Sequence, residues 1–125
     1  MNIKKVVVIG SGTMGSGIAA HLCNANIPVV LLDLKTEIAE KAKEKILKSK
    51  PPLLFEQSKI ENLITGNIID NFNNITDADW IREAVVERID IKHKIYEQIF
   101  KTRKKNSIVS SNTSTIPLNI LSQKL

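Results

Sequence analysis

Four glycines fall within eight residues directly after an unbroken apolar run near the start of the chain. The run, Val6–Ile9, lacks the alternation of apolar and polar residues that is typical of a half-exposed strand. It therefore predicts a parallel strand that is covered on both faces. Apolar residues then return at helical spacing from Thr13. A buried strand, a glycine turn and a helix thus follow one another, which limits the fold to a sheet with helices on each side.

The rest of the chain continues this alternation of strands and helices. Further strands are expected at Val29–Asp33, 63–65, 80–86 and from Ile108, and further helices from the capping residues Thr36 and Asp90. Pro51 and Pro52 are expected to end the second helix. Residues expected to face the sheet are Met14, Ile18 and Leu22, with Ala19 and Cys23 beside them, in the first helix, Ile38, Ala42 and Ile46 in the second, and Ile91, Ile95 and Ile99 in the third. Short right-handed crossovers make such a sheet parallel, so the predicted class is α/β.

Composition excludes several classes of protein. With 125 residues the chain is one domain, and it contains no apolar stretch of the roughly 20 residues that a membrane span needs. One cysteine and two histidines exclude a disulfide framework and an ordinary zinc site. The net charge of +5 comes from lysines at helical positions, and aromatic residues make up only 4%, so no nucleic-acid partner is expected. We expect a cytoplasmic protein with no membrane contact.

The glycines form the string Gly10-Ser11-Gly12-Thr13-Met14-Gly15, and Asp33 closes the next predicted strand. This context matches the fingerprint of a dinucleotide-binding fold. Gly10 permits the tight turn, Gly12 lets the backbone approach a pyrophosphate, and Gly15 lets helix and strand pack closely. Asp33 is expected to accept hydrogen bonds from the adenosine ribose and to repel the 2′-phosphate of NADP, so NAD is the predicted cofactor.

A second group of motifs narrows the class further: Ala84-Val85-Val86-Glu87, then Lys92, and later the segment "SNTS" at 111–114. Together with the glycine string, these motifs resemble the N-terminal NAD-binding domain of the L-3-hydroxyacyl-CoA dehydrogenases of fatty-acid β-oxidation, including the multifunctional enzymes of bacteria. The resemblance covers about residues 3 to 121. It implies a Rossmann-type doubly wound parallel sheet that is incomplete at its C-terminus. Residues 1–125 would then be a partial NAD-binding domain, without the helical C-terminal dehydrogenase domain.

The resemblance also implies roles for individual residues. Met14 and Asp33 would contact the adenosine side of NAD, and Ser114 would lie beside the nicotinamide and the substrate hydroxyl, with Asn112 in the same loop. The complete set of implied cofactor-binding residues is Gly10, Gly12, Thr13, Met14, Gly15, Asp33, Val85, Val86, Glu87, Lys92, Asn112 and Ser114. From the residues alone, Glu87 and Lys92 also fit an ordinary surface ion pair, and "SNTS" fits a turn or a helix cap.

Oxidation of a secondary alcohol needs a base, usually a histidine. The family's catalytic histidine lies in an "HFFNP"-like segment, which is expected beyond Leu125. Of the histidines present, His21 is expected on the surface or in helix packing, and His93 lies near the ligand edge of the sheet with no residue to orient it. The chain alone is therefore expected to be inactive, whereas the full-length parent would oxidise a (3S)-3-hydroxyacyl-CoA.

Two other functions are compatible with the sequence. One is a stand-alone NAD-binding or interaction module without catalysis. The other is a dehydrogenase of a different 3-hydroxy acid, which should lack the combination of Glu87, Lys92 and "SNTS". Because the last strand would lack a neighbour, we also expect a homo-oligomer or self-association through the exposed sheet edge.

Overall fold

The sheet has five parallel strands in the order β3-β2-β1-β4-β5. The structure is a computed structural model that describes residues 3–84 and 89–111. The strands are β1 (Val6–Ile9), β2 (Val29–Asp33), β3 (Leu63–Asn67), β4 (Trp80–Glu83) and β5 (Ile108–Ser111). This order confirms the predicted α/β class and places β1 and β4, which lead to helices on opposite faces, side by side.

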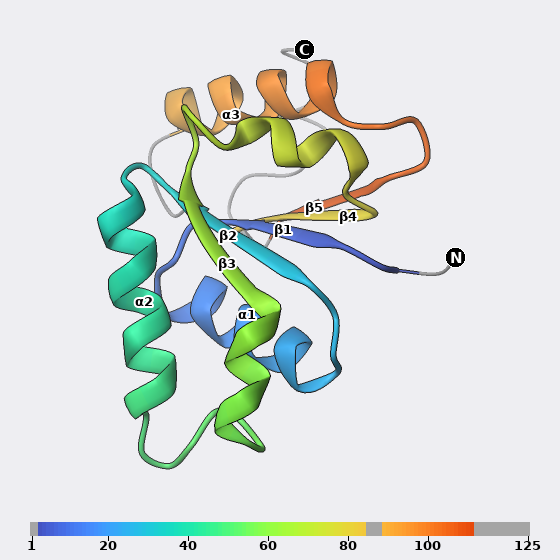
Figure 1. Ribbon diagram of the computed structural model, residues 1–125. Helices are drawn as coiled ribbons and strands as arrows, with labels where there is room; N and C mark the ends of the chain where they lie inside the picture. Colours follow the sequence, from blue (N-terminus) through green and yellow to red (C-terminus); the bar gives the residue numbers. More distant parts are fainter. Residues whose placement is uncertain (1–2, 85–88, 112–125) are drawn as a thin grey trace.

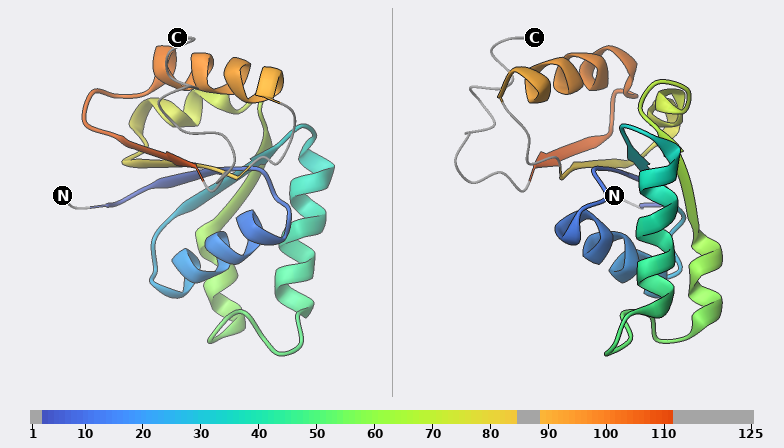
Figure 2. Two further views of the ribbon diagram at one scale, coloured as in Figure 1. Left: turned by 180° about the vertical axis from the view of Figure 1, so that it is seen from behind. Right: turned by 90° about the vertical axis from the view of Figure 1, so that its left-hand side faces the viewer.

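Helices cover both faces of the sheet (Figures 1 and 2). The helices α1 (Thr13–Asn24) and α2 (Thr36–Lys48) lie on one face, with the 3-10 helix η1 (Gln57–Asn62) beside them. The other face is covered by α3 (Ile89–Thr102) and the 3-10 helix η2 (Phe72–Asp77). The end of α2 at Lys48 agrees with the predicted break at the two prolines.

The central strand β1 divides the hydrophobic core into two parts. Its four residues are at most 1% exposed. Val6 and Val8 pack into the core under α1 and α2, whereas Val7 and Ile9 pack into the core under η2 and α3. Successive side chains of a strand point to opposite faces, so an apolar run without alternation fills both cores. The prediction from the VVVI run is confirmed.

The buried faces of two helices agree only in part with the predicted ones. In α1 the predicted residues Ala19, Leu22 and Cys23 are buried, whereas Met14 is 56% exposed and Gly15 is buried as well. In α2, Ile38 is 41% exposed, and Ala39 is buried in its place beside Ala42 and Ile46. Small residues let each helix axis lie close to the sheet, and this close approach decides the rotation of the helix. In α3, Ile95 and Ile99 are buried as predicted, and the Ile91 side chain lies outside the described part.

Neither of the two predicted capping residues lies at an N-cap. Lys35 is at the N-cap of α2 and makes no side-chain capping bond, while Thr36 is the first helical residue. The Thr36 hydroxyl oxygen accepts a hydrogen bond from the Asn67 amide at 3.0 Å, so it links α2 to the end of β3 instead. Helix α3 begins at Ile89, which puts Asp90 inside its first turn. Strand β4 ends at Glu83, and Val85 and Val86 of the longer predicted strand lie outside the described residues.

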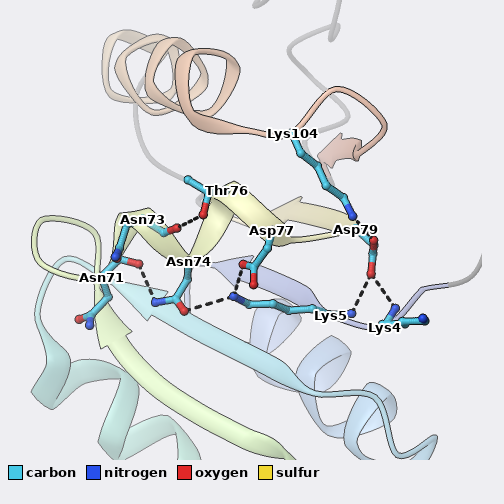
Figure 3. A network of polar contacts seen from close by, with 9 residues as sticks. All are labelled: Lys4, Lys5, Asn71, Asn73, Asn74, Thr76, Asp77, Asp79 and Lys104. Carbon is cyan, nitrogen blue, oxygen red and sulfur yellow. Dashed lines mark hydrogen bonds and ion pairs between the residues drawn. The ribbon is translucent and has the colours of Figure 1, made fainter.

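A polar network joins the amino ends of β1, β4 and β5 (Figure 3). Asp79, directly before β4, accepts hydrogen bonds from the backbone N–H groups of Lys4 at 2.7 Å and Lys5 at 3.1 Å, and it pairs with the Lys104 ammonium group. The Lys5 ammonium group pairs with Asp77 at 2.5 Å and donates to Asn74 at 3.3 Å. The network fixes the strand starts, at the end of the sheet opposite the glycine turn.

Candidate functional site

The glycine turn connects the end of β1 to the start of α1. Gly10 has a φ of 106°, in the region that side chains other than glycine rarely adopt. Its N–H donates to the carbonyl oxygen of Leu32 at 2.7 Å, so the turn begins while the chain is still held against β2. Gly12 is at the N-cap of α1 in extended conformation. The first part of the string therefore makes the tight turn that the sequence predicts.

Gly15 brings the first turn of α1 into contact with the end of β1. A Cβ atom at this position would stand 1.9 Å from the Gly10 carbonyl oxygen and 3.4 Å from the Cβ of Ala84. The obstacle is backbone and cannot rotate away. No residue except glycine fits here without a shift of the helix, which confirms the packing role predicted for Gly15.

The surface over Gly12 is open. A Cβ atom built on Gly12 meets no atom within 4 Å among the described residues. Within the described part of the chain no side chain caps α1, and the first turn of α1 holds no acidic residue. The first N–H groups of a helix lack partners within the helix, and with the helix dipole they attract an anion. The open side of Gly12 thus adjoins a helix end with the chemistry of a phosphate site.

Asp33, the last residue of β2, lies against the same turn. Its Oδ2 accepts hydrogen bonds from the Ser11 backbone N–H at 2.8 Å and from the Ser11 hydroxyl at 2.5 Å. Its Oδ1 accepts from the Leu34 backbone N–H at 2.7 Å. The structure brings the predicted carboxylate to the predicted turn, although the two segments are 22 residues apart in sequence.

A hollow of about 570 Å³ lies along the other side of α1. Its lining residues are Thr13, Met14, Gly17, Ile18, His21, Leu22 and Trp80. His21 is exposed, in agreement with the surface position predicted for it. The lining includes Thr13 and Met14 from the first turn of α1, but it does not include Gly10, Gly12 or Asp33.

The remaining predicted site residues are beyond what the structure describes. Val85, Val86 and Glu87 fall in the undescribed segment 85–88, and Asn112 and Ser114 fall in 112–125. The backbone of Lys92 belongs to α3, but its side chain, like that of His93, is not described. Their roles stay predictions.

Sequence reasoning missed two polar residues near the site. The sequence assigns no role to Ser11, which stands between two glycines, yet it is only 8% exposed and its hydroxyl donates a hydrogen bond to Asp33. Glu83 is fully buried at the end of β4, in register with Ile9. The sequence feature that could have indicated Glu83 is a carboxylate within a run that predicts a buried strand. The residues around Ser11 in the sequence contain no feature that indicates its partner Asp33.

Comparison with known proteins identifies the family to which the chain belongs. The family described as "3-hydroxyacyl-CoA dehydrogenase, NAD binding domain" matches residues 5–125. The chain belongs to this family. As a 3-hydroxyacyl-CoA dehydrogenase NAD-binding domain it takes NAD as cofactor, which confirms the cofactor predicted from the glycine string and Asp33.

Curated relatives of the domain are longer than the chain. A probable 3-hydroxyacyl-CoA dehydrogenase of Deinococcus radiodurans is 39% identical over 127 residues, which cover 96% of this chain and 37% of that protein. A putative fatty acid oxidation complex trifunctional enzyme of Rickettsia felis is 43% identical over 130 residues, covering 98% of this chain and 18% of that protein. The chain thus spans little more than a third of the first relative and less than a fifth of the second.

Solved structures share the fold. The 3-hydroxybutyryl-CoA dehydrogenase of Escherichia coli superposes with a TM-score of 0.84 at 28% identity, over 98% of this chain and 27% of that one. The dehydrogenase part of a multifunctional enzyme of C. elegans gives 0.83 at 25% identity, over all of this chain and 30% of that one. Within the described residues, no helix of the domain is long and apolar enough to cross a membrane.

Proposed function

We propose that the chain holds NAD for the oxidation of a (3S)-3-hydroxyacyl-CoA to the 3-oxoacyl-CoA in fatty-acid β-oxidation. NAD, when bound, accepts the hydride from the substrate carbon. The names of the Deinococcus and Rickettsia relatives support this reaction. The hydroxyl proton needs a base, and we assign that base to another part of the enzyme, because the matched region is only 37% of the Deinococcus relative.

The single observation that carries the cofactor geometry is the open surface over Gly12 with the Asp33 carboxylate beside it. A pyrophosphate over Gly12 would accept hydrogen bonds from the first turn of α1, at Thr13 and Met14. The ribose on its adenosine side would then donate to Asp33. A residue larger than glycine at position 12 would put its Cβ atom in the space proposed for the pyrophosphate. The described part of the protein itself leaves that space free.

The undescribed residues complete the proposal. Val85, Val86, Glu87 and Lys92 are proposed to line the course of the cofactor where β4 leads into α3. Asn112 and Ser114, in the segment after β5, are proposed to lie beside the nicotinamide, with Ser114 donating to the substrate hydroxyl. Their support is positional, because open α/β sheets bind ligands at the carboxyl ends of their strands.

Titration of the chain with NADH tests the assignment of Asp33. Asp33→Ala should weaken binding by about 1–3 kcal/mol, because the ribose loses a charged acceptor. The matched control is Asp77→Ala, which removes a carboxylate from the opposite end of the sheet. Equal NADH affinity in wild type and Asp33→Ala would contradict the assignment.

We also propose that the protein acts in the cytoplasm on acyl-CoA.

We further propose that the protein self-associates through β5. In the described sheet β5 is an edge strand, and Ile108 on it is 43% exposed. Exposed strand edges pair readily with other copies. Sedimentation should show an average mass that rises with concentration, and Ile108→Lys should lower it. A monomer at every concentration would contradict the self-association.

A further inference from the structure

We propose that the Ser11 hydroxyl is a positioning residue that orients the Asp33 carboxylate and thereby increases the preference for NAD over NADP. The inference rests on the proposed contact between Asp33 and the adenosine ribose. Nothing in the dinucleotide fingerprint requires a hydroxyl at this spacer position, since the fingerprint specifies only the glycines and the distant acid.

Among the residues that the structure describes, three donors fix the carboxylate before any ligand binds. Ser11 supplies two of them to Oδ2, its N–H at 2.8 Å and its hydroxyl at 2.5 Å, and Leu34 supplies the third to Oδ1 at 2.7 Å. An ionised carboxylate has about four acceptor positions. Both positions on Oδ2 are therefore filled, and the acceptor position left open is on Oδ1.

Only one of these donors depends on the identity of a side chain. The N–H groups at 11 and 34 are present with any residue except proline, whereas the hydroxyl is specific to the serine. Ser11 is itself held in place, because its carbonyl oxygen accepts a hydrogen bond from the Ser16 hydroxyl at 2.8 Å. With only 8% of Ser11 exposed, water cannot easily replace its hydroxyl.

An oriented Asp33 carboxylate affects the binding of NAD and of NADP in opposite directions. A ribose hydroxyl of NAD donates to the open position on Oδ1 and gains from a carboxylate that is already oriented. The 2′-phosphate of NADP offers only negative charge and accepting oxygens to the same group. A carboxylate held by the Ser11 hydroxyl cannot turn away from that phosphate, so its repulsion persists.

The test is titration of the chain with NADH and with NADPH, followed by cofactor fluorescence. Ser11→Ala should lower the ratio of NADH affinity to NADPH affinity about three- to tenfold, the size expected for the loss of one ordinary hydrogen bond, because the hydroxyl acts on the cofactor only through Asp33. Ser11→Thr keeps a hydroxyl and should keep the ratio. Ser11→Gly should behave like Ser11→Ala and serves as the second variant if the alanine variant does not fold.

Two controls separate positioning from loosening of the turn. Ser16→Ala removes the hydroxyl that donates to the Ser11 carbonyl oxygen rather than to Asp33. It should lower the melting temperature and leave the ratio of NADH affinity to NADPH affinity close to that of the wild type. In an Asp33→Ala background, Ser11→Ala should leave the ratio unchanged, because its target is gone. Equal weakening of NADH and NADPH by Ser11→Ala would overturn the inference while leaving the role of Asp33 intact. Failure of the wild type to bind NADH would overturn both.

Discussion

The carbonyl oxygen of Gly10 stands 1.9 Å from where a Cβ atom on residue 15 would be. Strand β1 and helix α1 therefore touch through backbone atoms, with no side chain between them. The contact places the first turn of α1 next to the open face of Gly12. It also fixes the rotation of the helix, which is why Met14 is exposed and Ala19 is buried.

Gly15→Ala should lower the free energy of unfolding by about 3 kcal/mol or more, because the obstacle is backbone rather than a movable side chain. Urea unfolding measures the change. Gly17→Ala is the matched control two residues along the same helix, where a Cβ meets nothing within 4 Å. It should raise stability by about 0.5–1 kcal/mol, as alanine replaces glycine inside a helix. Wild-type stability in Gly15→Ala would show that the turn can relax.

Gly12→Ala should separate binding from folding. The added methyl group has free space in the protein and an ordinary φ of −67°, so the melting temperature should stay within about 2 °C of the wild type. NADH affinity should fall about tenfold or more, because the methyl group occupies the place of the pyrophosphate. Unchanged NADH affinity, measured by calorimetry, would contradict the proposed position of the pyrophosphate over Gly12.

The polar network at the amino ends of the strands predicts sensitivity to acid. The Lys104 ammonium group, followed by the Lys4 N–H, lowers the pKa of Asp79, and the Lys5 ammonium group lowers the pKa of Asp77. The unfolded chain therefore takes up protons at a higher pH than the folded one. The stabilisation is complete above the ordinary aspartate pKa of about 3.9 and is lost as the pH falls through the lowered values.

Lys104→Ala should reduce this pH dependence, since it removes the largest cause of the Asp79 shift. Urea unfolding between pH 7 and about 2.5 measures the change of the unfolding free energy with pH. This range extends to both sides of the ordinary aspartate pKa. Lys105→Ala removes an equal charge from an exposed neighbour and should leave the dependence as in the wild type. Identical curves for the two variants would exclude a role for the Lys104 to Asp79 pair.

Cys23 should be inert in the folded protein. Burial raises the pKa of its thiol from 9.0 to about 11, and the side chain has no exposed surface. A thiol-specific reagent at about pH 8 should react with Cys23 only after urea is added, because the thiolate is the nucleophile. The raised pKa also contributes stability that is lost as the pH rises from 9.0 toward 11, since the unfolded thiol ionises first. Rapid reaction without urea would indicate that α1 opens locally.

The sequence predicts those features that depend on neighbours along the chain. Strand β1, the starts of α1 and β2 and the end of α2 follow from apolar runs, glycines and prolines that are local signals. The Asp33 position follows from a fixed spacing to the glycine string, and the structure confirms that the two meet.

Features set by tertiary contacts were not predictable in the same way. Ile38 and Ala39 both fit an apolar helix face, and only the closeness of α2 to the sheet decides that Ala39 is the buried one. The Ser11 hydroxyl finds its acceptor 22 residues away. Asp79 lies 75 residues from Lys4, and no local pattern links them.

The ion pairs of Lys5 and Lys104 lie at the amino ends of the strands (Figure 3). Gly12 and Asp33 lie at the other end of the sheet, where β1 and β2 finish. The ion pairs that respond to acid and the residues proposed to contact the cofactor are therefore separate sets. A designer who wants an NAD biosensor can reinforce the lysine and aspartate end without changing the proposed cofactor contacts, whereas Gly15 at the other end has to stay.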